Sequence, residues 1–285
     1  MNDYHIKAHA KINLGLDVIR KRPDGYHEVK MIMQSVGLSD VLTLEKTDQG
    51  ITLTTDSDNL PPTEDNLVYK AAKLMFDTFR IPGGLHIHLH KVIPIAAGMA
   101  GGSTDAAAAI KGINRLFDLE LPLSRLMELG VSIGADVPYC ILGGTALAEG
   151  IGEKLTPLSP SPDFYLVLAK PDISVSTKYV YENLDLTAIK KHPDIQGMAR
   201  AIEAGSLQGV LDRLGNVLET VTVPAYPVIS SIKRRMRELG AVNSLMSGSG
   251  PTVFGIFLSE RQAEFARGQI YDEGLAKQVF LTTPT

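Results

Sequence analysis

The stretch Ile93–Ile110 reads IPIAAGMAGGSTDAAAAI and places three glycines ahead of a hydroxyl pair, an aspartate and a run of alanines. Glycine lets the backbone approach a ligand closely and adopt positive φ. The helix that the alanines favour would begin with unpaired N–H groups and the positive end of its dipole. The pattern therefore predicts an anion site, most naturally for phosphate. A glycine turn ahead of a helix without any ligand is the alternative.

Two common phosphate motifs do not fit this stretch. A Walker A loop needs a lysine directly after its glycines, and none follows here. The dinucleotide fingerprint needs the spacing G-x-G-x-x-G, whereas this stretch has G-x-x-G-G. The loop must belong to another class of anion-binding protein.

The length, composition and charge of the chain narrow the class of protein to which it can belong. The chain has 285 residues, a formal net charge of −4 and 44% hydrophobic residues, which suits one large or two modest globular domains. The acidic balance argues against a nucleic-acid partner. Cys140 is the single cysteine and reads as a small buried residue, which fits a reducing compartment. With neither a signal-peptide pattern nor an apolar run of spanning length, we expect a soluble cytoplasmic protein, as a monomer or a homodimer, without a membrane partner.

The order of strand and helix patterns indicates α+β domains. Alternation predicts strands in Tyr4–Ile19, near Met31–Val36, Val41–Glu45 and Ile51–Thr55, and again in later segments. Helical spacing predicts a helix capped by Asp65 or Asn66, one from the glycines to about Phe117, and mainly helix from Lys178 to Val221. It also predicts a final helix capped by Ser259. The stretch LTPLSPSPDF resembles a linker, so we predict domains at 1–156 and 164–285.

The glycine stretch resembles the second motif of the GHMP kinases, P-x-x-x-G-L-G-G-G-S-S-D-A-A. Ala100 replaces a glycine of that motif, which requires negative φ or mild strain. AHAKINLGLD resembles the first motif and LMSGSGPTVFGIF the third, in the family's order. The resemblance implies an N-terminal ribosomal-protein-S5-like domain, a C-terminal ferredoxin-like domain, and ATP as a substrate. It assigns the ATP loop to Pro94, Ile95, Ala96, Ala97, Gly98, Met99, Ala100, Gly101, Gly102, Ser103 and Thr104, and a supporting loop to Gly248, Ser249 and Gly250.

The turn RPDGYHEV resembles one branch of the family, the 4-diphosphocytidyl-2-C-methyl-D-erythritol kinases of the non-mevalonate isoprenoid pathway. The resemblance implies an acceptor with a cytidine diphosphate handle. A pyrimidine needs a stacking ring and hydrogen-bond partners, which Tyr26 and His27 can supply. Thr177 is expected near the diphosphate or sugar, and Tyr181 as the opposing ring. Tyr179 competes with Tyr181, because spacing does not separate them.

The family places a catalytic aspartate in the segment SIGADVPYC, which indicates Asp136 as the group that receives the hydroxyl proton. By resemblance Lys11 reaches the same point, and Asn13 holds the substrate or the Lys–Asp pair. Mg²⁺ is expected on the ATP phosphates, with the Ser103 hydroxyl or a water chain as ligand. The residues alone leave a helix-cap role open for Asp136.

Three other interpretations accompany this one. Another GHMP kinase would use a different acceptor, such as homoserine or mevalonate, and an inactive nucleotide-binding protein would not need Lys11 and Asp136. RNA binding is disfavoured by the acidic balance.

His86, His88 and His90 share one strand face, where alternate histidines can bind a metal, but a solvated face is the more common arrangement.

Overall fold

The computed structural model describes residues 3–58, 60 and 63–285. The chain forms two compact units, each built from several segments. Unit 1 comprises the chain up to Ala10, Leu38–Ile95 and Ala100–Gly143, and unit 2 comprises Lys11–Gly37, Ala96–Met99 and Gly144–Thr285. The domain limits at 156 and 164 stay a prediction, since these units follow packing rather than chain order.

Two long strands, β1 (Asp3–Lys21) and β2 (His27–Thr47), contribute to both units. In unit 1, β4 (Gly84–His90) pairs antiparallel with the later part of β2 and parallel with β3 (Gly50–Thr55). The leucine and isoleucine side chains of β4 are fully buried, and its histidines alternate with them toward the other face. This alternation follows from the two-residue period of a strand.

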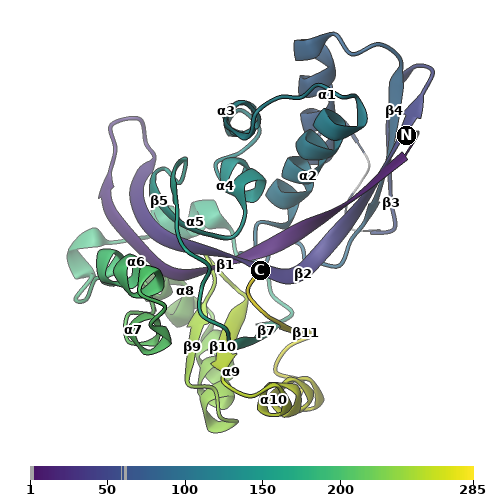
Figure 1. Ribbon diagram of the computed structural model, residues 1–285. Coiled ribbons are helices and arrows are strands. Elements are labelled where there is room, and N and C mark those ends of the chain that lie inside the picture. Colours follow the sequence, from purple (N-terminus) through teal and green to yellow (C-terminus); the bar gives the residue numbers. More distant parts are fainter. Residues whose placement is uncertain (1–2, 59, 61–62) are drawn as a thin grey trace. The chain divides into compact units, whose positions relative to one another are not determined.

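Helices cover the buried face of this sheet in unit 1, and α1 (Leu67–Phe79) and α2 (Gly101–Leu116) lie side by side (Figure 1). Both present small residues to their neighbours, including Ala106–Ala109 of α2. A Cβ added at Gly112 would lie 3.0 Å from the Leu44 side chain, so α2 packs closely on β2. The helices α3 (Leu123–Val131) and α4 (Val137–Leu142) pack beside α2.

Unit 2 contains a four-stranded antiparallel sheet in the order β11-β7-β10-β9. These strands are β7 (Tyr165–Lys170), β9 (Asn243–Met246), β10 (Val253–Phe257) and β11 (Gln278–Thr282). All five residues of the central β10 are buried. The helices α9 (Pro227–Glu238) and α10 (Glu260–Asp272) pack on this sheet.

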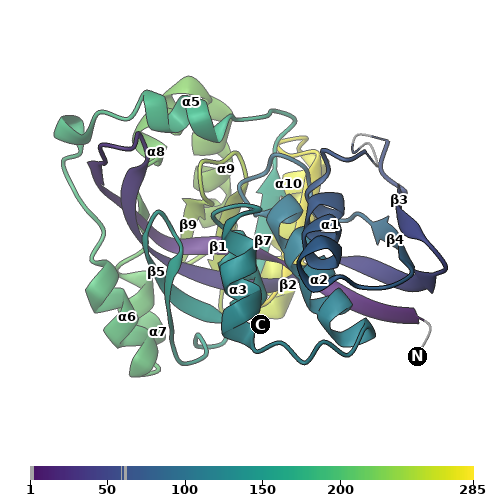
Figure 2. The same ribbon diagram turned by 90° about the horizontal axis from the view of Figure 1, so that it is seen from above.

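The remaining strands of unit 2 extend its other sheet. The first part of β2 pairs with β5 (Thr145–Gly150), which pairs with β6 (Lys154–Pro157), and β1 pairs with the short β8 (Gly215–Asn216). Between β7 and α9 lie α5 (Thr177–Glu182), the 3₁₀ turn η1 (Leu186–Ala188), α6 (Ile195–Glu203), α7 (Leu207–Leu211) and α8 (Glu219–Ala225). Helices α6 and α7 lie together in both views (Figure 2).

The α+β prediction is confirmed, with three local corrections. The segments predicted as separate strands near Met31–Val36 and Val41–Glu45 form the single strand β2. The segment from Lys178 to Val221, predicted as mainly helical, also contains β8, which pairs parallel with β1. Ser259 precedes α10 but its side chain makes no capping hydrogen bond.

Two further sequence features have defined surroundings. Cys140 is buried in α4, as expected for a small apolar residue. His86 and His88 make hydrogen bonds to the hydroxyls of Thr52 and Thr54 on β3. Within residues 3–58, 60 and 63–285, no group of three or more His, Cys, Asp or Glu side chains is arranged to hold a metal ion. No helix of these residues combines the length and apolar character needed to cross a membrane.

Candidate active site

The glycine segment forms a tight loop that leads directly into α2. Gly98 has φ 73°, and Ala100 precedes the helix with φ 58° and ψ 28°. Ala100 is therefore left-handed, which is the strained alternative expected for an alanine at this glycine position. No described side chain caps the start of α2, so the first N–H groups of this helix point to the space in front of it.

A buried ion-pair cluster lies behind this helix start. Lys91 forms an ion pair with Asp40, and its Nζ also lies 3.0 Å from the Oδ2 of Asp105. Asp40 Oδ1 also accepts hydrogen bonds from the backbone N–H groups of Val92 and Ile93, at 2.5 and 2.7 Å. Burial raises the pKa of Asp105 well above its usual range, although the Lys91 charge opposes that rise. The cluster fixes the strand end at residues 91–93 to the first turns of α2.

Asp136 lies at the start of α4, in the turn that follows Gly134. It occupies the N-cap position, but its side chain makes no capping hydrogen bond. A Cβ added at Gly134 would lie 3.9 Å from the Ser103 Oγ, so this turn adjoins the first turn of α2. Unit 1 therefore brings the segment of the predicted catalytic aspartate next to the predicted phosphate site.

Lys11 and Asn13 lie together on β1, where both side chains are buried. The Lys11 Nζ donates a hydrogen bond to Asn13 Oδ1 at 2.8 Å, and the Asn13 amide contacts the Met31 sulfur at 3.2 Å. The Lys11 N–H donates to the Met99 carbonyl at 3.2 Å. The first motif is thus hydrogen-bonded to the glycine loop. Lys11 and Asp136 belong to different units, so their pairing stays a prediction.

The third motif packs directly on the glycine loop. The Ser247 Oγ donates to the Gly98 carbonyl at 2.9 Å, and the Thr252 N–H donates to the Ala97 carbonyl at 3.4 Å. A Cβ added at Gly98 would lie only 2.4 Å from the Ser247 carbonyl oxygen. Glycine is therefore required at position 98 for two reasons. Its φ is positive, and a second backbone segment approaches it closely.

The turn between β1 and β2 presents a tyrosine and a histidine. Arg22 and Asp24 form an ion pair across the turn, and Asp24 accepts a hydrogen bond from the Tyr26 N–H at 3.1 Å. The Tyr26 side chain is 60% exposed. The His27 ring lies 5.2 Å from the Tyr181 ring, centroid to centroid, at a tilt of 35°. Burial and the Lys21 charge lower the pKa of His27, which favours a neutral imidazole that can both donate and accept hydrogen bonds.

Tyr181 and Thr177 both come from the short helix α5. The ring contact of Tyr181 with His27 distinguishes it from Tyr179, which is 43% exposed. The Thr177 hydroxyl lies 2.9 Å from the Ser249 hydroxyl, so α5 is hydrogen-bonded to the third motif. In unit 2, α5 therefore contacts the third-motif loop through Thr177 and the His27 ring through Tyr181.

Some of the other residues predicted for the ATP loop are buried, and others are exposed. Pro94, Ala97 and Met99 are buried and hold the loop against the protein. Ile95 is 40% exposed, and Ala96 is exposed with φ 52°. Gly101 and Gly102 form the first positions of α2, and the Thr104 hydroxyl donates to the His9 carbonyl at 2.7 Å. Gly248 and Gly250 have φ 56° and 90°, so the third-motif loop also depends on glycine.

Comparison with known proteins supports these motifs. The model of the GHMP kinases N terminal domain matches residues 66–144, and that of the GHMP kinases C terminal matches residues 187–276. The chain belongs to the GHMP kinase family. A 4-diphosphocytidyl-2-C-methyl-D-erythritol kinase of Lachnospira eligens is 54% identical over 99% of this chain and 98% of that relative. A second protein of that name, from Lachnoclostridium phytofermentans, is 53% identical over 99% of this chain and 97% of its own length.

A solved structure from the same branch of the family also matches this GHMP kinase. The crystal structure of a 4-(cytidine 5'-diphospho)-2C-methyl-D-erythritol kinase is 33% identical, with a TM-score of 0.85 and coverage of 99% of both chains. The resemblance predicted from the three motifs and the branch predicted from the D-G-Y-H turn are confirmed.

Several residues that shape the site were not predicted from the sequence. Asp40 and Lys91 lie far apart in the chain, and no spacing pattern links them to the glycine stretch. Asn216, Glu219 and Thr222 hold the third-motif loop from a segment that reads only as helical. A polar residue within an apolar segment, such as Thr222 between Val221 and Val223, is a sequence signal for such a contact.

Proposed function

We propose that this chain transfers a phosphoryl group from ATP to a hydroxyl of 4-diphosphocytidyl-2-C-methyl-D-erythritol, a step of the non-mevalonate route to isoprenoid precursors. The observation that carries the proposal is the 54% identity, over 99% of the chain, to a relative named for this activity. The contact between His27 and Tyr181 supports it, because it places an imidazole beside an aromatic ring where the D-G-Y-H turn meets α5.

ATP binds with its phosphates in front of α2. The N–H groups of Gly101, Gly102 and Ser103 have no partners within the helix and offer several donors to the anionic tail. The loop from Pro94 to Ala100 wraps the same tail, and its positive φ values let its backbone turn tightly around the phosphates. The chain thus stabilises the donor mainly through backbone donors.

The acceptor binds through its cytidine handle. Tyr26 stacks on the cytosine ring, and a neutral His27 can both donate to and accept from the edge of the base. Tyr181 lies against His27 and borders the same site. Thr177 lies toward the diphosphate or sugar, since its hydroxyl contacts Ser249 in the third-motif loop.

The transfer itself needs a positioned hydroxyl and one proton acceptor. The hydroxyl oxygen forms a bond to the γ-phosphorus, and the bond from that phosphorus to the bridging oxygen of ADP breaks. Asp136 receives the hydroxyl proton. Lys11 orients the hydroxyl and offsets developing negative charge, and Asn13 holds the Lys11 ammonium in place at 2.8 Å.

Mg²⁺ is part of the proposal as a companion of ATP. Among the described residues no group of three or more His, Cys, Asp or Glu side chains forms a metal cage. The Ser103 hydroxyl in the first turn of α2, or a water chain, would hold a Mg²⁺ that is bound largely by the phosphates of ATP and by water. When bound, Mg²⁺ would neutralise part of the charge on the phosphates.

A substrate panel tests the proposal. ADP release should be measured with 4-diphosphocytidyl-2-C-methyl-D-erythritol, homoserine and mevalonate as separate acceptors. We expect rapid release with the cytidylyl acceptor alone, because only that acceptor fits the ring contacts at His27 and Tyr181. Equal release with homoserine or mevalonate would favour another GHMP kinase activity. No release with any acceptor would favour an inactive nucleotide-binding protein.

A further inference from the structure

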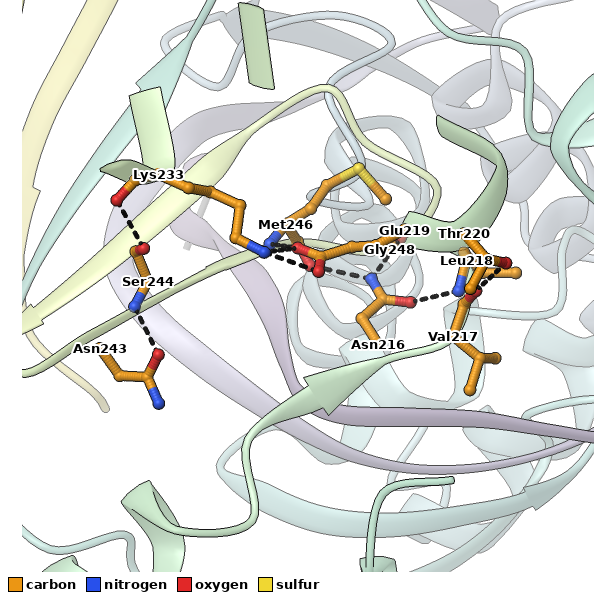
Figure 3. Close-up of polar contacts among 10 residues, drawn as sticks. All are labelled: Asn216, Val217, Leu218, Glu219, Thr220, Lys233, Asn243, Ser244, Met246 and Gly248. Atoms are coloured by element: carbon orange, nitrogen blue, oxygen red, sulfur yellow. Dashed lines mark hydrogen bonds and ion pairs between the residues drawn. The ribbon is translucent and has the colours of Figure 1, made fainter. Parts of the chain in front are cut away.

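The third-motif loop is hydrogen-bonded by a buried asparagine that precedes α8 (Figure 3). The Asn216 Nδ2 donates to the carbonyls of Met246 and Gly248, each at 2.8 Å. Its Oδ1 accepts from the Leu218 N–H at 3.0 Å. Both amide protons of this 7% exposed side chain are therefore directed at the backbone that enters the loop.

Glu219 contacts the same backbone at the N–H group of Met246. It accepts a hydrogen bond from the Met246 N–H at 2.9 Å, and both of its oxygens lie 2.6 Å from the Lys233 Nζ (Figure 3). Asn216 and Glu219 together engage both the N–H and the C=O of Met246. Lys233 comes from α9, so this charge-assisted contact also fixes α8 to α9.

Thr222 extends the set to the far end of the loop. It lies three residues after Glu219 on α8, hence on the same helix face. Its side chain is fully buried, and its hydroxyl donates to the Ser249 carbonyl at 3.2 Å. Its methyl group would lie 3.3 Å from a Cβ added at Gly250. Segment 216–222 therefore contacts the loop at successive points from Met246 to Gly250.

The loop also carries two side chains that contact residues proposed to bind the substrates. The Ser247 hydroxyl donates to the Gly98 carbonyl in the ATP loop, and the Ser249 hydroxyl lies 2.9 Å from that of Thr177. Gly248 and Gly250 make the loop backbone intrinsically free to change conformation. Its position must therefore come from the groups that hold it.

We infer that Asn216, Glu219 and Thr222 are positioning residues that clamp loop 247–250, and that this clamp sets the ATP loop and Thr177 in register for phosphoryl transfer. The catalytic part of the inference rests on the proposed function, whereas the clamp itself does not. None of these three residues is among those proposed to bind a substrate. Each acts through Ser247, Ser249 or the loop backbone.

A matched pair of variants at Thr222 tests the clamp. Thr222→Val keeps the shape and removes the hydroxyl, while Thr222→Ser keeps the hydroxyl and removes a buried methyl group. We expect Thr222→Val to lower kcat/KM about tenfold, the effect of one lost hydrogen bond on placement. Thr222→Ser should stay within about twofold of the parent. Amide exchange of residues 247–252, measured without substrate, should quicken in the valine variant alone.

Ser244→Ala serves as the control for lost stability. The Ser244 hydroxyl donates to the Lys233 carbonyl at 2.8 Å (Figure 3), and Ser244 lies on β9, outside loop 247–250 and outside the residues proposed to bind a substrate. This variant should lower Tm and leave kcat, KM and loop exchange unchanged. The clamp is overturned if Thr222→Val exchanges and turns over like the parent, or if Thr222→Ser or Ser244→Ala loses as much as Thr222→Val.

The exchange measurement separates this inference from the proposed function. If the parent protein fails to phosphorylate the cytidylyl acceptor, the proposed function fails. Quickened loop exchange in Thr222→Val would then still establish the clamp, and unchanged exchange would refute it.

Discussion

The carboxyl group of Asp105 lies one helical turn behind the start of α2, where a negative charge would oppose the binding of phosphates. Its surroundings hold one cation, Lys91, and a second carboxyl, Asp40. Because burial raises the pKa of Asp105 well above its usual range, the carboxyl retains a proton at a pH where an exposed aspartate has lost it. A protonated Asp105 leaves the cluster with no net charge behind the proposed phosphate site.

The Asp105→Asn variant tests this protonation state. The folded protein binds a proton here that the unfolded chain releases above about pH 4, so the parent should lose stability as the pH rises toward the folded pKa of Asp105. The asparagine variant lacks this loss. Urea unfolding from pH 5 to 8 should therefore show the variant gaining stability relative to the parent as the pH rises.

An exposed aspartate on α1 provides the control, since Asp77→Asn removes a carboxyl that is 65% exposed. Its stability difference from the parent should change little over this pH range. A stability difference between Asp105→Asn and the parent that stays constant from pH 5 to 8 would mean that Asp105 is already ionised and paired with Lys91 across this range.

At the scale of elements, two neighbouring positions of the glycine loop, 98 and 100, are expected to respond in opposite ways to a change between glycine and alanine. Gly98 and Ala100 both have positive φ, but only Gly98 faces a second backbone at close range. Adding a methyl group at 98 would bring a Cβ to 2.4 Å from the Ser247 carbonyl oxygen. Removing the methyl group at 100 relieves a left-handed alanine.

We therefore expect Gly98→Ala to destabilise the protein by at least about 2 kcal/mol and to raise KM for ATP. Ala100→Gly should change stability by no more than about 1 kcal/mol, in the stabilising direction. Thermal unfolding and ATP titrations of both variants provide the measurement. Equal effects of the two changes would show that the contact between the glycine loop and Ser247 does not constrain residue 98.

At the scale of the whole molecule, the features that can be predicted from the sequence are those set by residues close together in the chain. Alternation located β4, helical spacing with Asn66 located α1, and three local motifs indicated the family. Each of these signals is a short pattern with a direct physical cause, such as the two-residue period of a strand. They were sufficient for the fold class and for the glycine loop.

The remaining features depend on contacts between distant segments. The single strand β2 replaces two predicted ones, and Gly37, between them, donates its N–H to the Thr283 carbonyl at 3.0 Å. The contacts of Lys91 with Asp40 and Asp105, like the hydrogen bond of Asn216 to Gly248, join residues that no local pattern relates. Such contacts become visible only once the chain is folded.

The central claim is that the γ-phosphoryl group of ATP moves to a hydroxyl of the cytidylyl acceptor. Phosphorus NMR of the protein with MgATP and 4-diphosphocytidyl-2-C-methyl-D-erythritol tests it directly. We expect a new phosphomonoester resonance to grow as ATP becomes ADP, with the diphosphate resonances of the handle retained, and almost no growth with Asp136→Asn. ATP loss that yields only inorganic phosphate, or an Asp136→Asn variant as fast as the parent, would contradict the account.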